Sequence, residues 1–281
     1  MQKIDLKLLN IKVDLLALLV IGISHNQIYA ENSCQPFSDN VHQYYRVFNN
    51  SQYFPQSQIQ SKEKAYLVQA CILENKRDEI IGFKAGLTNK AAQKRYYSYE
   101  PVMGVLVEDN IKEIRETIYI ENKVAFIEAE LAFRLKRNID DLEDLDKAIA
   151  DLIDAVAPAI EVPLFHFEKA NTLEANDIIA ANVGAYRVIL GTFVMLGDID
   201  INSVKISISK EEKVVVNSID VKAQDRWEAL RWLIKKSYLE GYDLNKGTIY
   251  LTGSVVSPAI ANKANYRISF SQLEDILLAV E

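Results

Sequence analysis

Two carboxylates on one side of a predicted strand are the residues best suited to chemistry. In the stretch "AFIEAELAFRL", from Ala125 to Leu135, every second residue is apolar, and Glu128 and Glu130 fall together on the other face. Positions two apart on a strand are separated by about 7 Å, so both side chains can converge on one divalent cation. The alternative is that this face meets water, where acidic residues are common.

A third acid could complete a metal-ligand set. Glu161 stands in the short apolar strand "AIEVP", between Ile160 and Val162, where a free carboxylate is otherwise out of place. Hard cations such as Mg²⁺ and Mn²⁺ prefer oxygen ligands and keep waters that a substrate can displace. The spacing therefore indicates a candidate site for one such ion.

Other polar residues have weaker local signals. Lys84, in "GFKAGLT", can be a partner for a substrate carboxylate or a proton carrier, or simply a surface lysine. The segment "LTGS", from Leu251 to Ser254, can hold an anion or form a plain turn. The three histidines, His25, His42 and His166, give no catalytic triad.

The N-terminus has the order of a secretory signal. A lysine-bearing start precedes the apolar run from Leu15 to Ile23, and a polar segment ends at Ala30. The run is too short to span a bilayer, so we expect cleavage after Ala30, export to the periplasm or medium, and no stable membrane span afterwards. The alternative is an amphipathic or buried N-terminal helix, in which case a cytoplasmic protein is expected. Residues 31–60 are expected to form a leader or lid.

Composition limits the partners of the chain. It has 281 residues, a net charge of −7 and a pI near 5.2, and no Lys/Arg cluster with interleaved aromatics. Nucleic acid is therefore not an expected partner. An acidic protein can still bind an anionic substrate if a metal supplies positive charge. The two cysteines, Cys34 and Cys71, can form a disulfide in an exported protein, or Cys71 can be a buried thiol.

The elements that would position these residues form one α+β domain over residues 61–281. Patterns of apolar residues and caps predict helices over 61–76, 141–158 and 225–244. Strands are predicted over 79–89, 100–109, 125–135, 159–165, 186–194, 204–210, 213–218, 247–258 and 266–273. Residues 204–210 and 213–218 are predicted to form a β-hairpin. The stripe of Trp227, Leu230, Ile234 and Tyr238 is interpreted as core packing.

The ordered segments resemble a known family. "GFKAGLTNKAAQ", "EPVMGVL", "IEAELAFRL", "APAIEVP" and "RWLIKKSYLEGYDLNKGTIYLTGSVVSP" are similar to the 2-keto-4-pentenoate hydratase and 2-oxo acid decarboxylase branch of the fumarylacetoacetate hydrolase superfamily. The resemblance covers Ser61 to the C-terminus. It implies a β-rich roll with flanking helices, a homo-oligomer, and a lyase of aromatic catabolism acting on a small 2-oxo or 2-hydroxydienoic acid.

The same resemblance implies roles for individual residues. Mg²⁺ or Mn²⁺ would bind Glu128, Glu130 and Glu161, and Lys84 would contact substrate as a catalytic residue. Glu100, next to the place where the family usually has an acid, is the second catalytic candidate. The residues expected to bind substrate are Leu87, Asn182, Thr252 and Gly253.

Departures from the family pattern leave the reaction open. Tyr99 and Ala181 stand where acids are common, Pro163 stands where Asp is frequent, and the Trp-containing helix opens with "QDRWE" instead of a Gly-x-Pro. The metal ligands are thus kept while acid–base groups are changed. A hydratase is the first hypothesis. The alternatives are an acylpyruvate-type C–C hydrolase with His42 as base, and an exported, catalytically weakened 2-oxo-acid-binding homologue.

Overall fold

The computed structural model describes residues 34, 42–44, 46–47, 53–56, 59–76, 78–146, 148–217 and 226–281. The chain divides into two units, residues 1–38 and 39–281, and the second contains both sheets. The predicted signal, residues 1–30, lies outside the described residues, as does most of the predicted leader. Both cysteines are disulfide-bonded, so neither Cys34 nor Cys71 is a free thiol.

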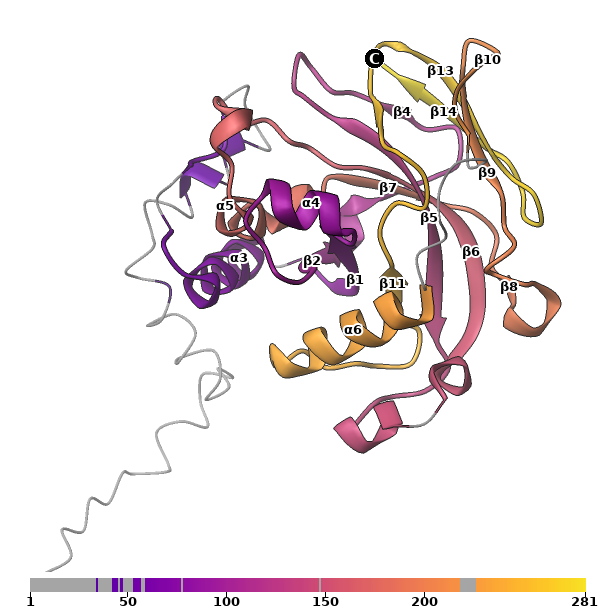
Figure 1. The fold of residues 1–281 in the computed structure, drawn as a ribbon, viewed down its shortest axis with the longest axis horizontal. Coiled ribbons are helices and arrows are strands. Elements are labelled where there is room, and N and C mark those ends of the chain that lie inside the picture. Colours follow the sequence, from indigo (N-terminus) through magenta and orange to yellow (C-terminus); the bar gives the residue numbers. More distant parts are fainter. Residues whose placement is uncertain are drawn as a thin grey trace, which may run out of the picture. The chain divides into compact units, whose positions relative to one another are not determined.

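The larger of two sheets carries the acidic strand (Figure 1). Its members are β1 (Ile80–Gly86), β2 (Val102–Val107), β3 (Ile111–Lys112), β5 (Phe126–Leu135), β6 (Ile153–Val162), β7 (Arg187–Leu190), β8 (Val194–Met195), β11 (Ile249–Leu251) and β12 (Ala259–Ile260). They run in the order β2-β1-β11-β5-β6-β7-β3, with β12 paired to β5 and β8 paired to β6. The long strands β5 and β6 are therefore interior, and most of their residues are buried on both faces.

A second sheet is built from the C-terminal part of the chain. Its strands are β4 (Thr117–Ile118), β9 (Ile206–Lys210), β10 (Lys213–Asn217), β13 (Ala264–Phe270) and β14 (Ile276–Val280), in the order β10-β9-β13-β14-β4. The predicted hairpin is confirmed: β9 and β10 pair antiparallel around Glu211 and Glu212, both at positive φ. The prediction that residues 266–273 form the last strand is wrong, because β14 follows and pairs with β13.

Helices flank the sheets, which gives the predicted α+β class. They are α3 (Lys62–Lys76), α4 (Lys90–Arg95), α5 (Ala175–Ala180) and α6 (Arg226–Leu239), with short 3-10 turns at η2 (Glu108–Asn110), η3 (Leu142–Asp146), η4 (Ile149–Leu152), η5 (Ala170–Thr172), η6 (Asn182–Gly184) and η7 (Leu196–Asp198). Helix α6 contacts β1 and β11 (Figure 1). Within the described residues, no helix is both long and apolar enough to cross a bilayer.

The predicted packing of α6 is confirmed. Leu230 and Ile234 are fully buried, and the Trp227 ring lies 5.8 Å from that of Phe133 on β5. Gly241 follows the helix at a φ of +86°, where a residue without a Cβ is favoured. The helix therefore packs against the sheet.

The predicted helix over residues 141–158 is wrong. The segment forms η3 and η4 and then enters β6, which continues through Pro158 to Val162. A strand buried on both faces is apolar at successive positions, so part of it also matches helical spacing. Acidic residues at the start of the segment also matched the preference of a helix for negative charge in its first turn.

Pro158 is accommodated where the neighbouring ladder is interrupted. Gly191 donates its backbone N–H to the Pro158 carbonyl at 2.9 Å, on the side of β6 that faces β7 and β8. The nitrogen and carbonyl of one strand residue point to the same side, so the proline nitrogen also faces the break between β7 and β8. A proline there removes no ladder hydrogen bond, and an interior strand can contain it.

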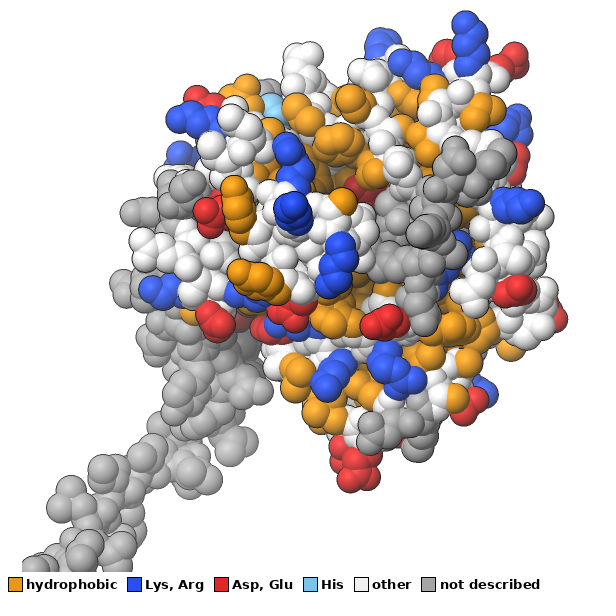
Figure 2. All heavy atoms as spheres, in the orientation of Figure 1, with side chains coloured by type: hydrophobic (Ala, Val, Ile, Leu, Met, Phe, Trp, Pro, Cys, Tyr) orange, Lys and Arg blue, Asp and Glu red, His pale blue; other side chains and the backbone are white. Residues whose placement is uncertain are grey.

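The visible surface has mixed charge. On the face drawn in Figure 2, Lys and Arg side chains lie among acidic and hydrophobic ones. Several of the basic side chains lie near the place of α4 in Figure 1, a helix that contains Lys90, Lys94 and Arg95.

Candidate metal centre

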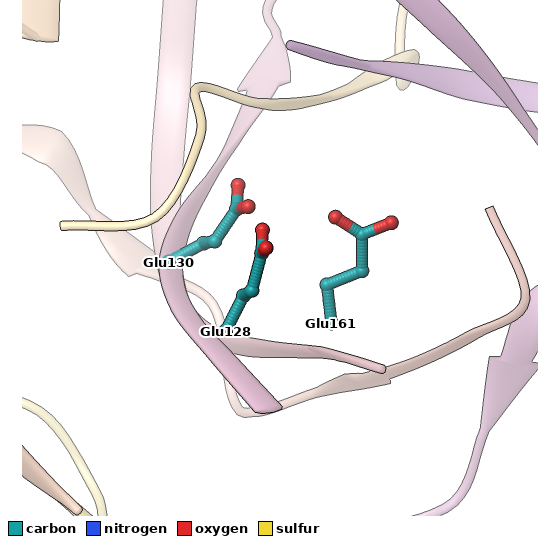
Figure 3. Close-up of side chains that lie close together, drawn as sticks. All are labelled: Glu128, Glu130 and Glu161. Carbon is teal, nitrogen blue, oxygen red and sulfur yellow. The ribbon is translucent and has the colours of Figure 1, made fainter. Parts of the chain in front are cut away.

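Strand β5 points two glutamates to the same side (Figure 3). The opposite face, Ile127, Ala129, Leu131, Phe133 and Leu135, is fully buried as its alternation predicts. The glutamate side is not a water-facing surface, because Glu130 is 0% exposed and Glu128 is only half-buried at a cavity. The alternative of an ordinary solvated face is therefore wrong.

The third acid reaches the first two through strand register. Glu161 on β6 lies directly opposite Glu128 on β5 in the antiparallel pair. One carboxylate oxygen from each of Glu128, Glu130 and Glu161 lies within 4.8 Å of the others. Figure 3 shows the Glu161 carboxylate standing across from the other two. The three acids thus form one compact group of oxygen donors.

The bonding of these oxygens leaves room for a cation. Glu130 Oε2 accepts a 2.9 Å hydrogen bond from the Gly253 backbone N–H, and Glu161 Oε1 is ion-paired with Lys84. Glu130 Oε1 and Glu161 Oε2 are buried and have no hydrogen-bond partner among the described residues. Buried oxygens of this kind need a partner, and a hard divalent cation supplies one. The residues therefore fit the expected Mg²⁺ or Mn²⁺.

Without a cation the charged form of the cluster is disfavoured. Burial and, next, the negative charge of Glu161 raise the pKa of Glu128 to about 7, while Lys84 acts to lower it. Burial, followed by the charges of Glu161 and Glu128, raises the pKa of Glu130 well above its usual range. Burial also raises the pKa of Glu161, while Lys84 opposes this effect. A bound divalent ion reverses this balance by favouring the carboxylates.

Lys84 is buried beside the acidic cluster, so the alternative of a surface lysine is wrong. It is 2% exposed, and its Nζ donates a 2.9 Å hydrogen bond to the Val183 carbonyl. Val183 has a φ of +53°, which turns the chain at η6. A Cβ added at Gly104 would lie 2.9 Å from Lys84 Cγ, so the absent side chain of Gly104 makes room for the lysine.

The loop after β11 supports the cluster with its backbone. Gly253 has a φ of +91°, and an added Cβ would lie 2.6 Å from Thr88 Cγ2. Its N–H is the group that holds Glu130. Gly253 thus positions the carboxylate of Glu130. The sequence resemblance predicted contact between Gly253 and substrate and did not indicate this positioning role.

A cavity of about 480 Å³ opens over Glu128. Five residues singled out from the sequence line it: Lys84, Leu87, Glu128, Thr252 and Gly253. The lining also includes Tyr96, Phe126, Phe165, Ile178 and Val183. The rings of Phe126 and Phe165 meet edge to face at 5.8 Å and form an apolar wall. The cavity therefore combines charged residues with an apolar wall, as small-molecule sites do.

Two of the residues predicted to be catalytic or to bind substrate, Glu100 and Asn182, do not line this cavity. Glu100 lies at the surface, where its Oε1 accepts a 2.8 Å hydrogen bond from Lys62 Nζ. The Asn182 amide accepts from the Val105 N–H and donates to the Val105 carbonyl, both at 2.8 Å. Asn182 therefore fastens η6 to β2, and neither residue is part of the cavity lining.

The described histidines also lie away from the cavity lining. His42 is exposed, and His166 is buried and stacked on Tyr53 with ring centroids 4.4 Å apart. His166 is thus a packed histidine, as expected. His25 lies outside the described residues.

Arg226 is a cavity residue that sequence reasoning did not select. It begins α6, is 5% exposed, and lines the cavity with Ala229 one turn further along the helix. The only sequence signal was the departure of "QDRWE" from the Gly-x-Pro pattern. This departure drew attention to the position, but it did not predict that the Arg226 side chain lines the cavity.

Comparison with known proteins gives relatives by sequence. No protein-family model matches the chain. It is 27% identical over 192 residues to a 2-keto-4-pentenoate hydratase of Burkholderia vietnamiensis, a match covering 66% of this chain and 72% of the relative. It is 28% identical over 193 residues to a protein of the same name from Paraburkholderia phymatum, with the same coverage of each chain.

The fold has solved counterparts. The structure of 4-oxalocrotonate decarboxylase from Pseudomonas putida G7, complexed with calcium and acetate, matches with a TM-score of 0.72 at 20% identity, covering 87% of this chain and 98% of that one. The same decarboxylase complexed with magnesium and adipate matches with a TM-score of 0.71 at 19% identity, covering 92% and 99%. The fold predicted from the sequence resemblance is therefore confirmed.

Proposed function

We propose that this chain, which resembles the 2-keto-4-pentenoate hydratase branch of the fumarylacetoacetate hydrolase superfamily in sequence and in fold, is a divalent-metal-dependent hydro-lyase acting on a small 2-oxo or 2-hydroxydienoic acid. The observation that carries the proposal is the group formed by Glu128, Glu130 and Glu161, of which Glu128 lines a cavity that also has an apolar wall. An acidic cluster alone would attract only cations. The cavity adds space for an organic acid beside the ion.

Each group of residues has a distinct part in such a reaction. Glu128, Glu130 and Glu161 would hold Mg²⁺ or Mn²⁺, which when bound supplies positive charge where an enolate develops. Lys84 lines the cavity and can hold or move a proton beside the reacting carbons, while its contacts with Glu161 and Val183 fix the position of its Nζ. Phe126 and Phe165 offer an apolar surface for the carbon chain of the acid.

A substrate screen tests the proposal. The full chain is incubated with Mn²⁺ and a set of 2-hydroxydienoic and 2-oxo acids, and products are identified by NMR. Hydration of a dienoic acid is expected, and Glu128→Gln should abolish it. Glu143→Gln removes an exposed carboxylate in η3 and should leave turnover unchanged. Absence of Mn²⁺ binding by the wild type, or full activity in Glu128→Gln, would contradict the proposal.

The acylpyruvate hydrolase is the less favoured alternative. It needs a base to activate water, and His42, the candidate for that role, is exposed and does not line the cavity. Release of acid from acylpyruvates by the wild type but not by His42→Ala would reinstate it.

A binding protein without turnover is the second candidate. It is favoured by the surface position of Glu100 and by the loss of acids at Tyr99 and Ala181, which leave Lys84 without a second predicted acid–base group at the cavity. Tight binding of 2-oxo acids with no product from any of them would support it. Product formation from a dienoic acid would exclude it.

We also propose export of the mature chain from residue 31 and a homo-oligomeric state. Both rest on the sequence, from the signal-like order of residues 1–30 and from the family resemblance. N-terminal sequencing of protein from cell fractions tests the first, and light scattering coupled to size exclusion tests the second.

A further inference from the structure

Arg226 brings a positive charge with an unsatisfied buried donor, Nη1, to the cavity. It is 5% exposed, its Nη2 donates only a long hydrogen bond of 3.4 Å to the Val204 carbonyl, and its buried Nη1 has no partner among the described residues. Burial lowers the pKa of this guanidinium, while the negative charge of Asp200 acts in the opposite direction. A buried guanidinium normally has its donors satisfied, so the free Nη1 calls for an anionic partner.

The other basic residue of the cavity lining is already engaged. Among the described residues that line the cavity, Lys84 and Arg226 are the basic ones, and Lys84 is ion-paired with Glu161. When the three glutamates are ionised, a bound divalent cation and Lys84 balance their charges. A ligand carboxylate that does not contact the cation then has no basic partner in the described cavity lining other than Arg226.

Residues of opposite charge line the cavity. Glu128 is contributed by β5, and Arg226 and Ala229 are contributed by the first turn of α6, so two different elements bring opposite charges to one cavity. Phe126 and Phe165 add an apolar wall to the same space. A short carbon chain with a 2-oxo acid at one end and a carboxylate at the other complements these surfaces.

We propose that Arg226 is the specificity-determining residue that pairs with a second carboxylate of the substrate, so that the substrate class is a 2-oxo or 2-hydroxydienoic dicarboxylic acid. The inference rests on the proposed function, because the 2-oxo acid end is taken to lie at the glutamate cluster. It adds a preference for dicarboxylic over monocarboxylic acids, which the glutamate cluster alone does not explain.

Binding of matched acid pairs tests the inference. Calorimetry compares 2-oxopentanoate with 2-oxoglutarate and 2-oxohexanoate with 2-oxoadipate, which differ in the terminal group, on the full chain with and without Mn²⁺. We expect the dicarboxylate of at least one pair to bind roughly tenfold more tightly or better, the gain of one charge-assisted hydrogen-bonded pair. Arg226→Gln should remove this preference and leave the affinity for the monocarboxylates unchanged.

Two further variants separate charge from folding. Arg226→Lys keeps the positive charge and should retain part of the preference, and it also serves if Arg226→Gln does not fold. Lys235→Gln removes an exposed cation from the same helix and should change nothing. No preference in the wild type, an unchanged preference in Arg226→Gln, or equal weakening of both acids would overturn the inference.

The design keeps two failures apart. If the wild type does not bind Mn²⁺, the proposed function fails, and the acid pairs measured without Mn²⁺ still decide the role of Arg226. If Mn²⁺ binds but the two acids of every pair bind equally, only the inference about Arg226 fails.

Discussion

Glu128 and Glu161 lie directly opposite one another on the adjacent antiparallel strands β5 and β6. Directly opposed side chains on one face of such a pair are about 5 Å apart at Cβ, so these carboxylates are forced together by register. Like charges in that arrangement are destabilising unless a cation or a proton separates them. The pairing thus supplies two of the three acids of the candidate metal site, and Glu130 is the third.

The first prediction concerns the metal ligands. Glu128→Gln should weaken Mn²⁺ binding by about 100-fold, because it removes one of three oxygen donors. The same change should raise the melting temperature of the metal-free protein, since it removes a buried charge next to Glu161. Calorimetric Mn²⁺ titration and thermal unfolding measure the two effects. Unchanged Mn²⁺ affinity would remove the site from consideration, and Glu143→Gln is the control.

The second prediction concerns pH. The folded state binds protons at Glu128 more tightly than the unfolded chain, because its pKa rises from 4.5 to about 7. The stability contributed by this group is therefore full below pH 4.5 and is lost as the pH rises through about 7. Glu130 and Glu161, whose pKa values are also raised, act in the same direction. The metal-free protein should become less stable across this window.

Added metal should reverse that trend. Binding needs ionised carboxylates, so the rise in melting temperature caused by Mn²⁺ should be larger at about pH 8 than at about pH 6. Thermal unfolding with and without Mn²⁺ measures it. In Glu128→Gln the loss of metal-free stability with rising pH should be smaller. An equal Mn²⁺ effect at both pH values would count against ionisation of this cluster.

The third prediction concerns the loop glycine. Gly253→Ala should weaken Mn²⁺ binding by about tenfold, because the added Cβ meets Thr88 and moves the N–H that holds Glu130. Gly247→Ala is a matched control, since Gly247 has a similar φ of +94° but an added Cβ there meets nothing within 4 Å. Both variants should lose stability, and only Gly253→Ala should lose metal affinity. Equal metal affinity in the two variants would show that Gly253 does not position Glu130.

The fourth prediction concerns Lys84. Lys84→Met should lower turnover by about 100-fold or more while Mn²⁺ binding is retained, because the change removes the proton carrier and leaves the three carboxylates in place. Lys123→Met is the control: Lys123 is also buried and ion-paired, with Glu121, but does not line the cavity. Steady-state kinetics and Mn²⁺ titration make the comparison. Full turnover in Lys84→Met would rule out its catalytic role.

Local patterns predicted much of the framework. The helix from Ser61 begins with a serine hydroxyl that accepts from the Lys64 N–H, as its cap predicted. The hairpin of β9 and β10 and the buried stripe of α6 followed from residue types a few positions apart. The helix predicted for residues 141–158 is wrong because an interior strand and a helix can share apolar spacing. Only the pairing of β6 with its partner strands distinguishes the two.

Within the site, the sequence by itself determined that Glu128 and Glu130 share a face, because alternation along a strand depends on neighbouring residues alone. Only the tertiary structure decided that this face is buried and that Glu161 stands opposite Glu128. It also left Glu100 at the surface and brought Arg226 to the cavity. These outcomes depend on which distant elements pack together, and strand register and helix placement are set by contacts far apart in the chain.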